Sequence, residues 1–503
     1  MYHPLVVWVT RALLVLVGSA GVAACGRVPI DPIGVGVNAP TGAASGGSTG
    51  TAGSGGSGGS GAAAGRGGTT GAAGRGGTTG AAGHGTTGAG GATATGGAGG
   101  SAGACAPLVT CGGVCVDTQH DHANCGGCGK VCASGQACAN GVCHTGVSRW
   151  PTLGADIHHS GFNADETGTP PLVPAWAVAL TNAALWPAVT DGSTIYVTAE
   201  TYFQGSTLLS ALSPTDGKVI WSYDFGDIFG IGQPTVDAGH VYVARCNNTP
   251  GSFMYAFVAA TGKVFWTEPV TAQWEHYWAP LVIGPRMYFD AGEYGGLYGL
   301  STADGSQLFF NSSLEQYDEW SPLYVGGTVY SFVEGNLRAH DELTGKIVST
   351  ASVTWDWRGW SMLTAPISDG AKIYFIAPPN LFAYLPGQTT STWTANGGYQ
   401  GMPAVASGVV YAISAGQLRA NDAGTGAVQW TFPADSALKY PPVIAGRWVY
   451  VASDANVYAV DTTTQKAVWS GAPGGWLSIA GGQLLVAQSN GILSAYALTP
   501  ATP

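Results

Sequence analysis

The stretch PTVDAGHVYVARCNNTPGSFMYAFVAATGKVFW, residues 234–266, decides the fold because the chain repeats its plan. A proline is followed eight residues later by a tyrosine in an apolar run, then by a turn glycine and, four residues on, by a tryptophan. Residues 403–430 follow the same plan from Pro403 through Tyr411 to Trp430. A period of about 36–47 residues made of short strands is typical of a propeller or a solenoid.

Seven repeats can be aligned on this plan. A turn glycine such as Gly262 allows the positive φ that a tight hairpin needs. The strand after the turn ends on an aromatic residue, and only Ser349 breaks this pattern. The opening prolines are Pro187, Pro234, Pro280, Pro322, Pro366, Pro403 and Pro442. Their tyrosines are Tyr196, Tyr242, Tyr288, Tyr330, Tyr374, Tyr411 and Tyr450. The closing aromatics are Trp221, Trp266, Phe309, Trp393, Trp430 and Trp469.

An eighth repeat begins near Leu477 and stops after three strands, at Tyr496. The missing strand is found at the front, in residues 171–176, which end on Trp176. We therefore predict an all-β fold, an eight-bladed β-propeller over 150–499 closed by an N-terminal strand, because closure removes open sheet edges. Each repeated tryptophan should wedge between blades, with an acceptor near its indole N–H.

The turn sequences carry a family resemblance. Residues 217–221 (GKVIW), 261–266 (TGKVFW) and 425–430 (TGAVQW) resemble the tryptophan-docking motif of pyrroloquinoline-quinone-type propeller repeats. The opening Trp150-Pro, with Asp156 and His159-Ser-Gly161 after it, is similar to the usual start of such domains. The resemblance covers about residues 150–499. It implies either a quinoprotein dehydrogenase or a non-enzymatic relative, such as the propeller lipoprotein of the outer-membrane β-barrel assembly machinery.

Charge is distributed unevenly along the chain. Residues 150–503 hold twelve of the Lys and Arg residues and twenty-six of the Asp and Glu residues, a net charge of −14. That sign repels phosphate backbones, which argues against a nucleic-acid partner.

The N-terminus has the pattern of an export signal. Residues 1–24 contain Arg11 and then a short apolar run that ends in small residues. Such a run is too short to span a bilayer comfortably and is typical of a secretory signal. Residues 22–25 (VAAC) resemble the lipobox of bacterial lipoproteins, which implies cleavage before Cys25 and a lipid on its thiol. We expect an exported protein anchored to a bacterial membrane, most simply the outer membrane or cell surface.

Residues 25–104 consist of this cysteine and a spacer rich in Gly, Ala, Ser and Thr. A nine-residue repeat places Arg66, Arg75 and His84 at equal intervals. Because the spacer has almost nothing to bury, we expect a disordered linker whose mean reach is roughly 50 Å.

Eight cysteines lie within residues 105–144. An even count in a short exported segment indicates a disulfide framework, since so small a piece cannot build a sufficient core. Two zinc sites, a redox Cys-x-x-Cys and a widened haem motif are weaker alternatives, and the connectivity stays open. The spacing resembles the stigma-specific cysteine-rich modules. The cysteines are Cys105, Cys111, Cys115, Cys125, Cys128, Cys132, Cys138 and Cys143.

The quinone enzymes of the resembling family hold their cofactor over a vicinal disulfide, with calcium and a catalytic Asp. This sequence has no adjacent cysteine pair, and Cys246 is its one cysteine in the propeller region. We expect Cys246 to be a buried, inert thiol. We also expect no catalytic residue, no metal site and no cofactor. The alternative is an enzyme, which would need a carboxylate with a perturbed pKa in the channel.

Three loops before strand-opening prolines are rich in tryptophan and acidic residues, and equivalent loops share one face of a propeller. Flat aromatics beside carboxylates suit stacking on sugars or anchoring of a peptide, whereas packing over the channel is the alternative. The binding alternative requires exposed tryptophans, which are costly without a purpose. We predict a monomeric, non-catalytic envelope lipoprotein that binds glycan or polypeptide here. The candidate residues are Trp274, Glu275, His276, Trp278, Asp318, Trp320, Asp356, Trp357, Arg358 and Trp360.

Overall fold

The structure is a computed structural model, in which the described part of the chain consists of strands and turns without a helix. It describes residues 108–111, 114–116, 118, 124–131, 136–139, 141–145, 148–199, 208–355, 359 and 361–500. The predicted signal, Cys25 and the linker lie outside these residues. Since no helix occurs among the described residues, none of them belongs to a helix that could cross a membrane.

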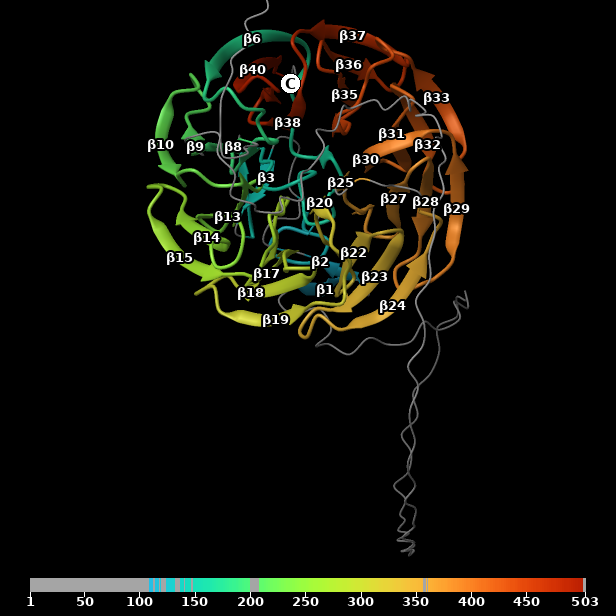
Figure 1. Cartoon of the computed structure of the whole chain (residues 1–503). Coiled ribbons are helices and arrows are strands. Elements are labelled where there is room, and N and C mark those ends of the chain that lie inside the picture. The colour runs from blue at the N-terminus through green and yellow to red at the C-terminus, as the bar shows by residue number, and fades with distance from the viewer. Residues whose placement is uncertain are drawn as a thin grey trace, which may run out of the picture. The chain divides into compact units, whose positions relative to one another are not determined.

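Eight antiparallel sheets are arranged around a common centre, as predicted (Figure 1). In the first four blades the chain runs from the inner strand to the outer strand, and each inner strand follows a strand-opening proline. These blades contain β7 (Val189–Thr190), β8 (Ile195–Thr198), β9 (Leu208–Leu212) and β10 (Val219–Asp224); β11 (Gly230–Ile231), β12 (Thr235–Asp237), β13 (His240–Cys246), β14 (Phe253–Val258) and β15 (Val264–Pro269); β16 (Leu281–Ile283), β17 (Arg286–Asp290), β18 (Leu297–Ser301) and β19 (Gln307–Asn311); and β21 (Leu323–Val325), β22 (Thr328–Val333), β23 (Asn336–Asp341) and β24 (Ile347–Ser352).

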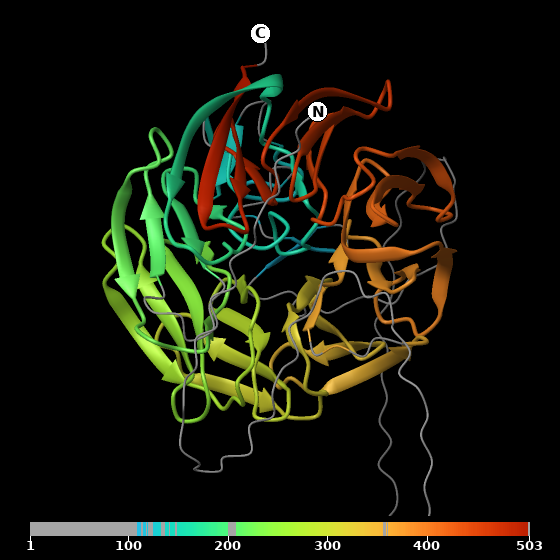
Figure 2. The ribbon, with the colours of Figure 1, turned by 45° about the horizontal axis from the view of Figure 1, so that its top comes forward.

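The remaining four blades continue this order, and Figure 2 shows them as twisted sheets side by side. They contain β26 (Ile367–Ser368), β27 (Ile373–Ala377), β28 (Asn380–Tyr384) and β29 (Ser391–Asn396); β30 (Tyr399–Ala406), β31 (Val409–Ser414), β32 (Gln417–Asp422) and β33 (Val428–Phe432); β34 (Val443–Ala445), β35 (Trp448–Ala452), β36 (Val457–Asp461) and β37 (Lys466–Gly471); and β38 (Trp476–Ala480), β39 (Gln483–Ala487), β40 (Ile492–Thr499) and β6 (Thr169–Ala179).

The eighth sheet joins the two ends of the propeller sequence. β6 pairs antiparallel with β40, and Trp176 stands opposite Ala495. The indole N–H of Trp176 donates to the carbonyl of Pro214 in the first blade at 2.9 Å. Trp176 therefore links the last blade to the first.

The repeated tryptophans join neighbouring blades as predicted. The indole N–H of Trp221 donates to Ala259 O at 2.8 Å, and that of Trp266 donates to Thr302 O at 2.9 Å. Both acceptors belong to the turn of the next blade, where the turn glycine lies against the indole ring. A Cβ atom added to Gly262 would lie 2.5 Å from the ring of Trp221. The motif therefore pairs the last strands of the first, second and fifth blades with the turn of the following blade.

Replacing Gly262 by alanine should lower the free energy of unfolding more than the same change at Gly239. Both glycines have a positive φ, +69° and +79°, which penalises any side chain. Only at Gly262 does the new methyl meet an indole, since a Cβ at Gly239 has nothing within 4 Å. We expect the two variants to differ by about 1–3 kcal/mol in urea unfolding. Equal losses would show that the ring contact contributes nothing.

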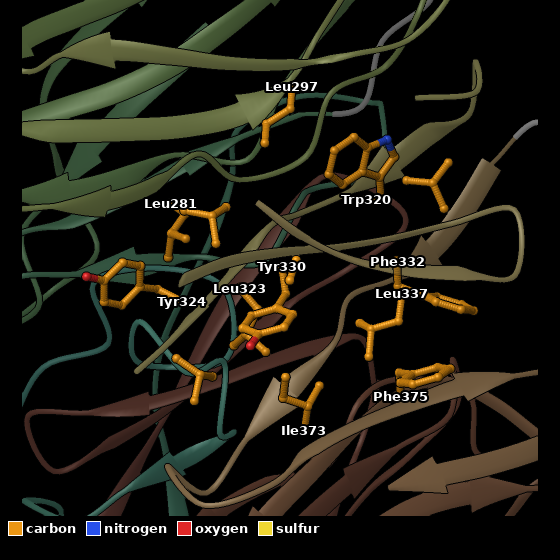
Figure 3. Packing of buried hydrophobic residues seen from close by; sticks show 14 of the residues in the cluster. Leu281, Leu297, Trp320, Leu323, Tyr324, Tyr330, Phe332, Leu337, Ile373 and Phe375 are labelled. Atoms are coloured by element: carbon orange, nitrogen blue, oxygen red, sulfur yellow. The ribbon is translucent and has the colours of Figure 1, made fainter. Parts of the chain in front are cut away.

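The buried cores are shared between blades. One cluster combines side chains of the third, fourth and fifth blades around Trp320, Tyr330 and Phe375 (Figure 3). The strand-two tyrosines of all seven aligned repeats are buried. Neighbouring sheets therefore pack through continuous apolar layers.

The segment that precedes β6 crosses the hub. It includes β5 (Phe162–Asn163), which pairs in parallel with β34. Between residues 150 and 163 it hydrogen-bonds to the inner strands of seven blades. The partners are Trp150 with Thr190, Pro151 O with Val236 N, Ile157 O with Tyr324 N, His158 O with Ser368 N, Ser160 O with Val405 N, Gly161 O with Ile444 N, and Asn163 Nδ2 with Ile479 O.

A compact turn shapes this hub segment. The Asp156 carboxylate accepts hydrogen bonds from the backbone N–H of His158 at 2.8 Å and of Ser160 at 3.1 Å. It also accepts from the Ser160 hydroxyl at 2.5 Å. Asp156 thus holds the chain in the arc that lets successive residues reach successive blades.

Part of the cysteine-rich module is described. It forms two hairpins, β1 (Val109–Cys111) with β2 (Val114–Val116) and β3 (Gln136–Ala139) with β4 (Val142–Thr145). Cys111 is bonded to Cys128, and Cys125 and Cys143 are also disulfide-bonded. Cys115 and Cys138 are described by their backbone, whereas Cys105 and Cys132 lie outside the described residues. These bonds support the predicted disulfide framework.

Candidate binding face

Two of the three predicted loops lie side by side, on the blades where we expected them. The backbone N–H of Glu319 donates to His276 O at 2.9 Å. His276 Nδ1 lies 3.8 Å from Asp318 Oδ2. The second loop forms β20 (Asp318–Trp320), which pairs in parallel with β25 (Ser361–Thr364), directly after the third loop.

The third loop cannot be evaluated residue by residue. Asp356, Trp357, Arg358 and Trp360 lie outside the described residues. The residue that directly follows this loop is described: the Ser361 hydroxyl donates to the Glu319 carboxylate. The predicted neighbourhood of the three loops is therefore supported at their described ends.

Trp278 and Trp320 follow the packing alternative, because each is 1% exposed. Each stands two residues before a strand-opening proline, and its indole is packed in a buried cluster. Trp278 contacts Trp476 with ring centroids 6.2 Å apart. Trp320 belongs to the core shared by the third to fifth blades. Both contribute to packing and cannot contact a ligand without rearrangement.

The polar candidates are buried as well. Glu275, His276 and Asp318 are 2%, 1% and 3% exposed. The Tyr277 hydroxyl donates to Glu275 Oε2 at 3.0 Å. The ring of His276 packs on Phe229 with centroids 4.5 Å apart. These buried side chains lie beneath the surface of the face and do not form part of it.

Trp274 is the predicted residue that reaches solvent. Its side chain is 41% exposed, and its backbone has a φ of 55°. The loop is fixed by a hydrogen bond from Trp274 N to Asn247 O at 3.3 Å. The indole meets Phe229 edge to face at 5.8 Å. A rigid, half-exposed indole of this kind suits an anchoring role.

Tyr294 is a second exposed aromatic that the sequence pattern did not single out. It is 69% exposed and lies in the turn between β17 and β18. Its loop runs parallel to the Trp274 loop, because Ala272 and Gly292 form a parallel bridge and Gly292 N donates to Thr271 O at 2.9 Å. The available signal was an aromatic residue in a glycine-rich hairpin turn, between Gly292 and Gly295.

Asp290, at the end of β17, adds a buried carboxyl to the same region. Burial raises its pKa well above the ordinary value, and the nearby charges of Glu275 and Asp318 act in the same direction. Burial also raises the pKa of the Cys246 thiol, which is fully buried. Cys246 is buried, as predicted, whereas Asp290 was missed because it sits in an ordinary strand pattern.

Replacing Asp290 by asparagine should stabilise the fold at neutral pH. The folded chain holds the Asp290 proton more tightly than the unfolded chain, so this group's contribution to stability is present at acid pH and is lost as pH rises above about 3.9. Asparagine mimics the protonated form at every pH. We expect the unfolding free energy to rise by about 1.4 kcal/mol or more at pH 7 and to change little at pH 4.

The control for this prediction is Asp227→Asn, which removes the same charge from an exposed position. Its stability should stay within about 0.5 kcal/mol of the original chain. Thermal melting at both pH values measures the difference. An equal gain for Asp290→Asn at pH 4 and pH 7 would contradict a raised pKa.

The residues present do not fit a pyrroloquinoline quinone. Such a flat cofactor needs an open space between side chains, whereas the aromatic rings around Trp476 pack on one another. Trp476 has its ring centroid 6.4 Å from Trp186 and 5.2 Å from Tyr440. The sequence lacks adjacent cysteines. Among the described residues, no three His, Cys, Asp or Glu side chains are arranged as a metal site.

Family comparisons match both folded parts of the chain. The model for PQQ_2, described as outer membrane protein assembly factor BamB, matches residues 173–253, 249–432 and 415–501. The model for the stigma-specific STIG1-like protein family matches residues 99–146. Together these matches bear out both resemblances noted in the sequence.

Solved structures share the propeller fold. BamB from Moraxella catarrhalis is 15% identical, with a TM-score of 0.53, and the match covers 65% of this chain and 100% of that one. The quinohemoprotein alcohol dehydrogenase ADHIIG from Pseudomonas putida HK5 is 12% identical, with a TM-score of 0.54, covering 71% of this chain and 81% of that one. At these identities the likeness concerns the fold alone.

A curated relative matches a smaller part. Tetrathionate hydrolase from Acidithiobacillus ferrooxidans is 29% identical over 133 residues, which are 25% of this chain. The match spans 26% of the hydrolase's own length.

Proposed function

Because the chain belongs to the PQQ_2 family, described as outer membrane protein assembly factor BamB, we propose that it is a non-catalytic binding propeller of the bacterial envelope. In this proposal Cys25 carries the lipid anchor, the linker lifts the folded part from the membrane, and the face around Trp274 binds a glycan or a polypeptide. The chain acts as a monomer.

The observation that carries the proposal is Trp274. The loop that holds it was singled out by sequence, and its indole is 41% exposed over a buried floor. Hydrogen bonds on both sides fix the loop, so little conformational entropy is lost on binding.

The test compares the full chain with its Trp274→Ala variant in glycan and polypeptide binding screens. Phe265→Ala is the matched control, because Phe265 is 47% exposed on the outer strand β15. We expect Trp274→Ala to weaken binding about tenfold or more and Phe265→Ala to leave it unchanged. Binding that survives loss of Trp274 would reject the proposal.

A scaffold for β-barrel assembly is the second candidate, favoured by the family match and by the likeness to BamB. The long linker and the cysteine-rich module argue for the first candidate, since a scaffold docked at the membrane surface does not require them. Crosslinking in cells separates the two. Assembly-machinery proteins among the products favour the scaffold, whereas polysaccharide or external protein favours the binder.

A quinoprotein dehydrogenase is the lesser alternative. It is supported by fold likeness to the alcohol dehydrogenase. The aromatic filling of the hub and the missing cysteine pair argue against it.

A further inference from the structure

Two exposed aromatic rings stand on adjacent, parallel loops of the binding face. Trp274 and Tyr294 each follow, by two residues, a member of the Ala272–Gly292 bridge. Their side chains are 41% and 69% exposed. Exposed aromatic faces bind cations through the ring quadrupole, and nearby carboxylates add a Coulombic attraction.

Acidic residues occur in the same loops as this aromatic pair and next to its packing partner Phe229. Glu293 is exposed and precedes Tyr294, and Asp227 is exposed two residues before Phe229, which packs on Trp274. Below them, Glu275 and Asp318 are buried. The exposed carboxylates favour an approaching cation over an anion at the pair.

The nearby arginine Arg338 does little to cancel this attraction. Its Nη2 lies 2.5 Å from Glu315 Oε1, so its charge is matched locally. Arg245 keeps its positive charge, but it lies on β13 over the ring of Phe253, with its Cζ 5.8 Å from the centroid, outside the two loops that hold the aromatic pair.

We propose that the Trp274–Tyr294 pair binds arginine or lysine side chains of a polypeptide, an inference that rests on the proposed function of this face. A guanidinium can stack on an indole while its N–H groups donate to carboxylates. A neutral sugar would gain no Coulombic attraction from the carboxylates. The polypeptide partner is therefore favoured over the glycan.

The experiment measures the affinity of the full chain for a short peptide of alternating glycine and arginine by calorimetry. A matched peptide carries citrulline, which keeps the shape of arginine without its charge. We expect the arginine peptide to bind, more weakly as salt is raised, and the citrulline peptide not to bind. Trp274→Ala combined with Tyr294→Ala should lower the affinity about tenfold or more.

Two controls separate this site from general attraction to an acidic protein. Phe265→Ala removes an aromatic of similar exposure elsewhere, and Asp304→Asn removes an exposed charge from a turn of the third blade, for comparison with Glu293→Gln. Neither control should change the affinity, whereas Glu293→Gln should weaken it. Equal losses in the controls, or equal binding of the citrulline peptide, would overturn the inference.

Failure of this inference is distinguishable from failure of the proposed function. If glycan or another ligand binds through Trp274 while the arginine peptide does not bind, the proposed function is supported and the cation site is rejected. If no ligand depends on Trp274, both the cation site and the proposed function are rejected.

Discussion

Replacing Trp150 by alanine is expected to lower the free energy of unfolding by about 3–5 kcal/mol, as large-to-small changes of a buried tryptophan do. Trp150 is 1% exposed and begins the segment that crosses the hub. Its backbone exchanges hydrogen bonds with Thr190 at 2.9 and 2.8 Å. Its indole packs in the core of the seventh and eighth blades. The change therefore leaves a cavity where the first blade meets the last ones.

Chemical unfolding of the full chain, followed by tryptophan fluorescence or circular dichroism, measures this loss. Trp274→Ala is the control, because it removes the same side chain from an exposed position and should stay within about 0.5 kcal/mol. If the Trp150 and Trp274 variants were equally stable, the hub segment would not be part of the cooperative core.

Replacing Trp176 by alanine should also cost about 3 kcal/mol or more, for a different reason. Its indole N–H donates to Pro214 O at 2.9 Å, and its ring lies against Gly217, where an added Cβ would be 2.5 Å away. Both contacts belong to the first blade, whereas β6 pairs with β40 of the eighth. The change should let β6 separate from the first blade and expose it to protease.

Trp221→Ala is the matched control, because Trp221 makes the same contacts between the first and second blades. Its cost should be similar, but cleavage within residues 169–179 should stay slow. Cleavage there at equal rates in both variants would argue that Trp176 does not hold the ends of the propeller together.

The repeat pattern was sufficient to predict the blades because each blade is built locally. Strands, turn glycine and closing tryptophan all lie within one repeat, and the indole finds its acceptor in the next turn. The blade number followed from counting. The cysteine-rich module was likewise recognisable from its spacing, and Cys111–Cys128 agrees with a disulfide framework.

The candidate site was predicted less completely, because side-chain direction depends on the ring as a whole. Trp278 and Trp320 look like surface residues in a loop sequence, yet both are packed in buried clusters. Asp290 lies in the regular strand pattern and Tyr294 in a glycine-rich hairpin turn, and neither was singled out. The role of residues 150–163 is non-local, since their partners are spread over seven blades.

The central claim is that the surface around Trp274 is where the protein meets its partner. A photoreactive amino acid placed at position 274 of the full chain in living cells tests this most directly, with position 265 on the outer rim as the comparison. We predict a specific crosslinked product from position 274 and none from position 265. Products from position 265 alone, or the same products from both positions, would contradict the claim.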